Sequence, residues 1–159
     1  MNSTISTGMR SRKRILGVSS GGGHWVELLR LMPAFERHDV ALVTVDNTYR
    51  GGAGSARFYT VTDVTRWNKL QWVRTISKLV WILACERPDV VVSTGALPGY
   101  FAVRLAKWFG ARTIWIDSIA NVDKLSMSGK KIGAYADMWL TQWPHLAKPE
   151  GPLYRGSVL

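Results

Sequence analysis

The sequence ILGVSSGGGHW, residues 15–25, runs from an apolar strand pattern through a glycine-rich turn into a helical pattern. Glycines at a strand-to-helix turn let the phosphates of a ligand approach the backbone, and the free N–H groups at the start of a helix favour an anion there. We therefore predict that Ser20, Gly21, Gly22 and Gly23 form an anion-binding turn that ends at a titratable side chain, His24. A glycine run that only permits a tight turn is the alternative interpretation.

The glycine turn matches neither of the two common nucleotide-binding motifs. Counted from Gly21, the third glycine of G-x-G-x-x-G would fall on Val26. Gly17 and Gly22 have the separation of a P-loop, but Gly23-His24 stands where that motif requires lysine and serine or threonine. The turn therefore predicts contact with phosphate without predicting a complete nucleotide site.

Strand and helix patterns alternate along the chain. Strands are predicted at 15–19, 40–45, 58–61, 89–93, 113–116 and 138–141, and helices at 25–35, 70–86, 100–109 and 131–135. This order predicts an α/β fold, a Rossmann-like parallel sheet with helices on both faces. Ligands of such sheets bind beyond the carboxyl ends of the strands. The glycine turn, a second loop at 95–99 and the pair Asp117-Ser118 all follow strands and are expected at that edge.

Three segments are predicted: a basic flexible leader at 1–14, one Rossmann-like domain at 15–142, and an irregular tail at 143–159 that offers a docking segment for a partner. The chain has 159 residues, a net charge of +10 and 47% hydrophobic residues. The positive charge favours an anionic partner, and nucleic acid, an anionic membrane surface and a phosphorylated substrate all qualify. The sequence has no stretch long and apolar enough for a spanning helix, and the leader lacks the apolar middle of a signal peptide.

The cysteine and histidine content argues against disulfide and metal chemistry. Cys85 is the only cysteine, so no internal disulfide can form. The three histidines, His24, His38 and His145, are far apart in the sequence, and we expect no metal site and no cofactor.

His24 and Asp117 are the candidate catalytic residues. Histidine titrates near neutral pH and suits a general base, although His24 can also be a helix-start residue without chemistry. Glu27 either orients His24 or caps the helix. Asp117 is either catalytic or a helix cap. Gly95 and Ala96 belong to a second loop that is either an ordinary strand-to-helix connection or part of the same site.

The predicted helix at 70–86 and the residues before it combine aromatic bulk with cations. This pattern suits a membrane interface, where indole rings lie at headgroup depth and lysines reach phosphates. A core helix with one solvent-exposed face is the alternative interpretation. The residues assigned to membrane contact are Trp67, Lys69, Trp72, Arg74, Lys78 and Trp81.

Four blocks of the sequence resemble one protein family. Ser19–His24 with Glu27-Leu28 resembles its S-x-G-G-H-x-x-E-[LM] opening, and the later blocks lie at 86–96, 115–130 and 136–144. The family comprises the membrane-associated, acceptor-side subunits of split GT-B glycosyltransferases. It includes the eukaryotic anchor subunit of the dolichol-linked N-acetylglucosaminyltransferase and bacterial PssD-type proteins of capsule and exopolysaccharide synthesis. The resemblance covers residues 15–152.

The resemblance implies the N-terminal half of a GT-B enzyme, with a separate chain that binds the nucleotide sugar. It implies an inverting, metal-independent transfer from a UDP-sugar to a polyprenyl-diphosphate-linked saccharide, at the cytoplasmic face of the inner membrane in a bacterium. His24 is the first candidate base and Asp117, which stands where relatives often have glutamate, the second. Ser118 joins the glycine loops as a predicted binding residue. The donor can be an N-acetylglucosamine, glucuronic acid or galactose nucleotide.

Two other functions stay open. The chain can be a membrane recruiter whose partner carries all the chemistry, or a nucleic-acid-binding domain that its charge alone explains. No nucleic-acid-binding motif accompanies the cations, so we expect no nucleic-acid partner.

Overall fold

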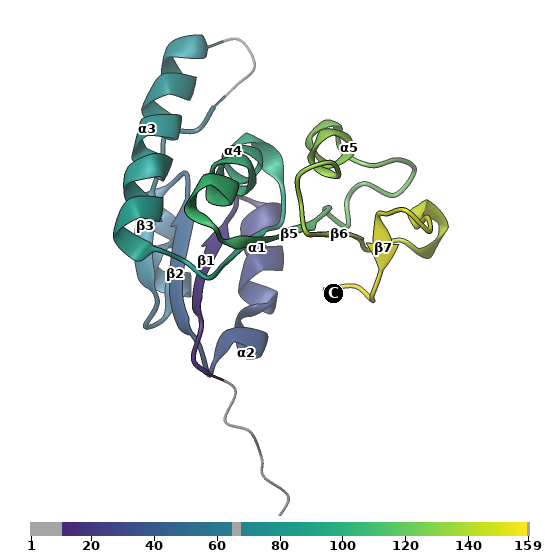
Figure 1. Ribbon diagram of the computed structural model, residues 1–159, viewed down its shortest axis with the longest axis horizontal. Coiled ribbons are helices and arrows are strands. Elements are labelled where there is room, and N and C mark those ends of the chain that lie inside the picture. The colour runs from purple at the N-terminus through teal and green to yellow at the C-terminus, as the bar shows by residue number, and fades with distance from the viewer. Residues whose placement is uncertain (1–10, 65–67, 159) are drawn as a thin grey trace, which may run out of the picture.

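The computed structural model describes residues 11–64 and 68–158. One parallel sheet has the strand order β3-β2-β1-β4-β5-β6-β7, with helices on both of its faces (Figure 1). Its strands are β1 (Arg14–Val18), β2 (Asp39–Thr44), β3 (Arg57–Thr60), β4 (Val90–Ser93), β5 (Arg112–Ile116), β6 (Met138–Thr141) and β7 (Leu153–Tyr154). The predicted Rossmann-like class is confirmed.

Helices connect most of the strands. The α-helices are α1 (Gly23–Arg30), α2 (Met32–Phe35), α3 (Lys69–Glu86), α4 (Ala96–Ala106) and α5 (Met127–Ile132). The 3₁₀ turns are η1 (Asn47–Ala53), η2 (Lys107–Phe109) and η3 (Pro144–Leu146). None of the helices in the described part of the chain has the length and apolarity needed to cross a bilayer.

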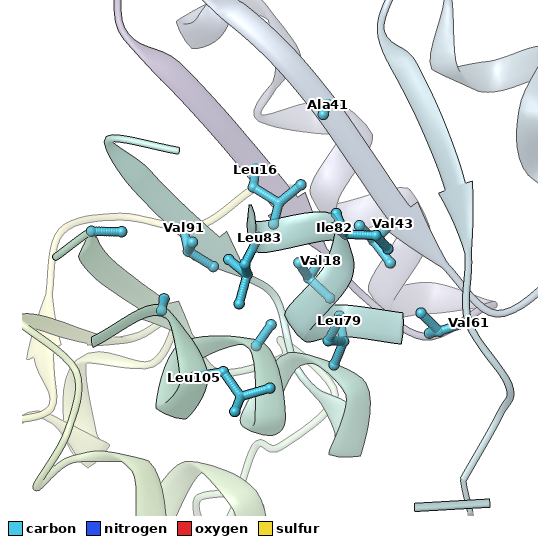
Figure 2. Close-up of a cluster of buried hydrophobic side chains, with 13 residues drawn as sticks. Leu16, Val18, Ala41, Val43, Val61, Leu79, Ile82, Leu83, Val91 and Leu105 are labelled. Atoms are coloured by element: carbon cyan, nitrogen blue, oxygen red, sulfur yellow. The ribbon is translucent and has the colours of Figure 1, made fainter. Parts of the chain in front are cut away.

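The main core lies between the central strands and the helices α3 and α4. Leu16, Val43 and Val91 of the sheet meet Leu79 and Leu105 of the two helices (Figure 2). Burying a Val or Leu side chain contributes about 1.5–3 kcal/mol, so this cluster fixes α3 and α4 on one face of the sheet.

The opposite face of the sheet carries α1. Trp25 and Leu28 pack there against Leu42 of β2. Gly17 keeps this contact close, because a Cβ at that position would lie 2.8 Å from Leu42 Cδ2 and 3.1 Å from Leu28 Cδ1. The strand β1 is thus covered on both faces, as the continuous apolar run predicts.

The helix boundaries differ from the predictions in ways that place functional residues inside helices. The predicted helix 25–35 begins earlier, at Gly23, and is divided at Leu31, because Pro33 has no N–H to continue the hydrogen-bond ladder. The predicted helix 100–109 begins at Ala96. Pro98 fits in its first turn, where an N–H has no intrahelical acceptor. His24 and Ala96 therefore lie in first helical turns rather than in loops.

The last part of the chain also differs. The predicted helix 131–135 begins at Met127 instead, because the Ser126 hydroxyl accepts a hydrogen bond from Gly129 N and caps it. The tail, which we expected to be irregular, contains η3 and adds the short strand β7 beside β6.

A charged cluster joins α3 to β3 at the amino edge of the sheet. Glu86 receives hydrogen bonds from Arg57 and from the Tyr59 hydroxyl. Burial alone would raise the pKa of Glu86, but these hydrogen bonds leave that pKa below its ordinary value. The hydrogen bond between the Tyr59 hydroxyl and Glu86 raises the pKa of Tyr59 to about 12. The cluster holds the C-terminal end of α3 against the sheet edge.

Among the described glycines, Gly99 makes the closest approach to a neighbouring side chain, where α4 meets the end of β4. A Cβ on Gly99 would overlap the Ser93 hydroxyl and would lie 3.0 Å from Ser93 Cβ, while Ser93 itself is fully buried. We expect Gly99→Ala to lower the free energy of unfolding by about 1–3 kcal/mol, the usual cost of overpacking.

Thermal denaturation followed by circular dichroism measures this effect. Gly51→Ala is the matched control, because a Cβ at Gly51 meets nothing within 4 Å. Equal melting temperatures for the two variants would contradict the close approach of α4 and β4.

Candidate active site

A pocket of about 650 Å³ lies beyond the carboxyl ends of the strands. One part of its wall is polar, with His24, Ser118, Ser126 and Lys131, and another part is apolar. The apolar part consists of Val64, Trp72, Ala96, Leu97, Tyr100, Phe101, Ala120 and Met127. A hollow of about 880 Å³ lies at the opposite, amino edge and is lined by Arg14, Arg87 and Arg112 among others. The smaller pocket is the candidate site, because parallel α/β sheets bind ligands at the carboxyl edge.

His24 is held by the segment that follows β4. Its Nδ1 lies 2.9 Å from the Thr94 carbonyl oxygen, and the Thr94 hydroxyl donates to the His24 carbonyl at 2.7 Å. A carbonyl oxygen only accepts, so Nδ1 carries the proton and the neutral ring keeps its lone pair on Nε2. The ring is therefore fixed in the tautomer that a general base needs.

The two predicted glycine loops meet at this histidine. A Cβ on Gly95 would lie 2.6 Å from His24 Cε1, and Gly95 has a φ of +137° that favours glycine. Gly95 therefore lets the imidazole ring pack directly on the backbone that precedes α4. The sequence placed both loops at one sheet edge, and the structure brings them into contact.

The first glycine loop is partly open. The N–H of Gly22 donates to the Tyr49 hydroxyl at 2.9 Å, and α1 has no side-chain cap among the described residues. A Cβ on Gly23 would meet nothing within 4 Å, so the backbone is accessible there. Ser20 is half-buried and turns its hydroxyl toward the Gly21 carbonyl. Anion binding by this loop stays a prediction.

Asp117 is buried and fully engaged by its own neighbourhood. Its Oδ1 accepts from the Ser126 hydroxyl at 2.6 Å, and its Oδ2 accepts from Ser126 N at 2.8 Å. Only 2% of Asp117 is exposed, and it does not line the pocket. This geometry fits a residue that shapes the loop before α5, whereas Ser118 does line the pocket.

Glu27 is the residue whose role the sequence did not reveal. It is 4% exposed and accepts hydrogen bonds from the Ser118 hydroxyl at 2.7 Å and from Gln142 Nε2 at 2.9 Å. Ile119 N adds a third bond at 3.3 Å. Glu27 therefore neither orients His24 nor caps α1. It ties α1 to the segments after β5 and β6.

The residues assigned to membrane contact divide into two groups. Lys69, Arg74, Lys78 and Trp81 are exposed on α3. Trp72 is half-buried, with its ring 5.4 Å from that of Phe101 on α4, and it lines the pocket. Helical periodicity explains this position, because residue 72 points toward α4 when residues 70 and 81 point outward. Membrane contact by Trp72 stays a prediction. Trp67 lies outside the described residues.

Several pocket residues were not assigned from the sequence. Ser126, Ser128 and Lys131 lie at the start of α5 and on it, and Asn121 lies in the loop before it. The available signal was that these residues lie in the family-like block at 115–130 or, for Lys131, just after it. Only the packing of α5 against α4 brings them to His24.

Comparison with known proteins identifies the family. Residues 56–157 match the family model described as "Oligosaccharide biosynthesis protein Alg14 like". The chain is 26% identical to UDP-N-acetylglucosamine transferase subunit alg14 of Schizosaccharomyces pombe, over 86% of this chain and 78% of that protein. It is also 26% identical to the human subunit ALG14, over 94% of this chain and 85% of that protein.

Solved structures place the fold. MurG of Acinetobacter baumannii superposes with a TM-score of 0.75 at 10% identity, over 92% of this chain and 46% of that chain. A UDP-N-acetylglucosamine 2-epimerase of Rickettsia bellii gives a TM-score of 0.71 at 16% identity, over 93% of this chain and 46% of its own. The chain thus spans about half the length of these proteins, and its fold is that of the N-terminal half of GT-B enzymes such as MurG. The sheet order, the carboxyl-edge pocket and the matched residues agree, and the chain belongs to the Alg14-like family of oligosaccharide biosynthesis proteins.

Proposed function

We propose that this chain is the acceptor-side subunit of a two-chain, inverting glycosyltransferase. It would bind a lipid-linked diphosphate sugar, and a separate chain would bind the UDP-sugar. The observation that carries the proposal is His24, whose Nδ1 is fixed by the Thr94 carbonyl while the residue lines the carboxyl-edge pocket. UDP-N-acetylglucosamine is the favoured donor, because the relatives are named as subunits of its transferase.

The proposed reaction is a direct displacement. An acceptor hydroxyl attacks the anomeric carbon of the donor sugar. The bond between that carbon and the UDP oxygen breaks, and UDP leaves. Nε2 of His24 takes the hydroxyl proton as the new bond forms. Asp117, our second candidate base, is better suited to positioning, because Ser126 uses both of its oxygens.

The likeness to MurG supports a two-chain enzyme. The match covers 46% of the MurG chain, and a separate chain would supply the domain that corresponds to its other half. The open backbone at Gly23 and the Lys131 ammonium are the proposed contacts for the acceptor diphosphate, because both favour an anion. Gly21, Gly22, Gly95 and Ser20 would shape the loops around it.

Membrane contact is proposed through the outward face of α3. Leu70 is 78% exposed and Val73 is 64% exposed, with Arg74 and Lys78 exposed beside them. Apolar side chains next to cations suit the surface of an anionic bilayer. Peripheral binding at the cytoplasmic face stays a prediction. A bacterial exopolysaccharide or capsule pathway also stays a prediction, because the matching relatives described above are eukaryotic.

His24→Ala tests the chemistry. In the complex of both subunits, we expect turnover to fall by about 10²–10⁴-fold, the usual cost of losing a general base. UDP release from UDP-N-acetylglucosamine with a polyprenyl-diphosphate-linked sugar measures it. His38→Ala, at a histidine near the amino edge, is the control. Unchanged turnover in His24→Ala would contradict the catalytic role and favour the recruiter.

Glu27→Gln tests whether the hydrogen bonds of Glu27 stabilise the segments that form the pocket. The Ile119 N–H and the Gln142 amide group donate to different oxygens of Glu27, and the new side chain has only one oxygen, so these two contacts cannot both be kept. We expect stability to fall by about 1–3 kcal/mol, the cost of unsatisfied buried groups, and the KM for the acceptor to rise. Denaturant unfolding and acceptor titration measure the two effects, and Glu36→Gln, at an exposed glutamate, is the control. Wild-type behaviour in both assays would overturn this role.

The double variant Leu70→Ser/Val73→Ser tests the membrane face. We expect weaker sedimentation with phosphatidylglycerol vesicles and unchanged circular dichroism, because both side chains are exposed. The double variant Val26→Ser/Val122→Ser, at apolar residues exposed elsewhere, is the control. Equal sedimentation of both variants would contradict the assignment, and tighter binding to RNA or DNA than to vesicles would favour a nucleic-acid function.

A further inference from the structure

A mainly apolar groove between α3 and α4 lies next to the candidate pocket. A second hollow of about 210 Å³ is lined by Ile76, Tyr100, Phe101, Arg104, Leu105 and Trp108. Tyr100 and Phe101 also line the pocket that contains His24. The two hollows therefore share a wall, and together they follow α4 away from the carboxyl edge of the sheet.

Aromatic rings form the wall that the two hollows share. Phe101 lies 5.4 Å from the ring of Trp72 and 6.0 Å from that of Tyr100. At the far end Trp108 is 82% exposed, although it is one of the largest apolar side chains. From Tyr100 to Trp108 the helix and the turn after it extend about 12 Å. The groove is thus mainly apolar, and an exposed indole ring borders its far end.

Arg104 lines the groove, but its guanidinium is engaged by two aromatic side chains. Arg104 donates to the Tyr100 hydroxyl at 3.3 Å, and its guanidinium lies over the Tyr135 ring, 3.8 Å from the centroid. Lys131 lines the pocket near His24. A ligand that extends from the pocket across Tyr100 and Phe101 to the second hollow meets a cation and hydroxyl groups first and mainly apolar side chains afterwards.

We infer that this groove holds the first isoprene units of the lipid-linked acceptor, with the diphosphate in the His24 pocket. An anionic head joined to a thin apolar chain matches the order of polar and apolar walls. This inference rests on the proposed function. It adds that the chain of the acceptor is recognised by the protein and is not left wholly in the bilayer.

The groove is separate from the proposed membrane face. Leu70 and Trp81 point outward on α3, whereas Trp72 and Ile76 lie on the side toward α4. Substitutions in the groove can therefore be tested without changing the outward face.

Chain-length dependence of the kinetics tests the groove. We compare Trp108→Ser with wild type in the two-subunit complex, using acceptors with a farnesyl chain and with a methyl group on the diphosphate, in detergent-free solution. We expect the KM for the farnesyl acceptor to rise about tenfold and the KM for the methyl acceptor to stay unchanged. Phe109→Ser is the matched control, because Phe109 is exposed next to Trp108 but does not line the groove. Equal effects on both acceptors, or none, would overturn the inference.

Photo-crosslinking gives a readout independent of turnover. A benzophenone-bearing geranyl diphosphate is irradiated with the complex, and labelled peptides are identified by mass spectrometry. Labels within 96–109 and at 72–76, reduced in Trp108→Ser, would support the groove. Labels only at Leu70, Val73 or Trp81, or no labels, would contradict it. If no lipid-linked acceptor reacts with any UDP-sugar, the proposed function fails, and the crosslinks still decide whether the groove binds an isoprenoid chain.

Discussion

The buried carboxylate of Glu27 is the constraint on which the shape of the carboxyl edge depends. A charge that is 4% exposed is stable only when donors surround it, and three donors from two other segments do so. Because Glu27 and His24 lie on the same short helix, the donors that satisfy Glu27 also hold the helix that carries the histidine, while the Thr94 carbonyl orients its ring. Gln142 in turn accepts from Val158 N, so the end of the described chain is held by the same network.

Close backbone approach is the second requirement of the site. Gly95 lets the His24 ring rest on the start of α4, and Gly99 lets α4 lie against the end of β4. With larger residues, α4 would move away from β4, and its aromatic residues would no longer border the His24 pocket. The pocket is therefore a product of small residues in the elements around it as much as of the polar groups that line it.

The helix α3 serves two surfaces. Its inward side supplies Leu79 and Leu83 to the core and Trp72 and Ile76 to the groove, and its outward side presents Leu70 and Trp81 beside exposed cations. A core helix with one solvent-exposed face would present mainly polar side chains on that face. The exposed apolar residues on α3 instead support the proposed contact with a lipid surface.

Sequence periodicity determined the α/β class, the parallel sheet and the edge at which His24, Gly95 and Ser118 would meet, because apolar runs and glycine turns are local signals. It could not separate the roles of Glu27, Asp117 and Trp72. The positions of a carboxylate's donors, or of the partner of a half-buried ring, depend on segments up to 115 residues away. It also placed Ala96 and His24 in loops, although both lie in first helical turns. The order of the strands β1 to β6 and of the helices between them thus followed from the sequence alone, whereas β7 did not. The tertiary structure decided which polar groups support the site and which face the ligand, because hydrogen bonds between distant segments leave no local pattern.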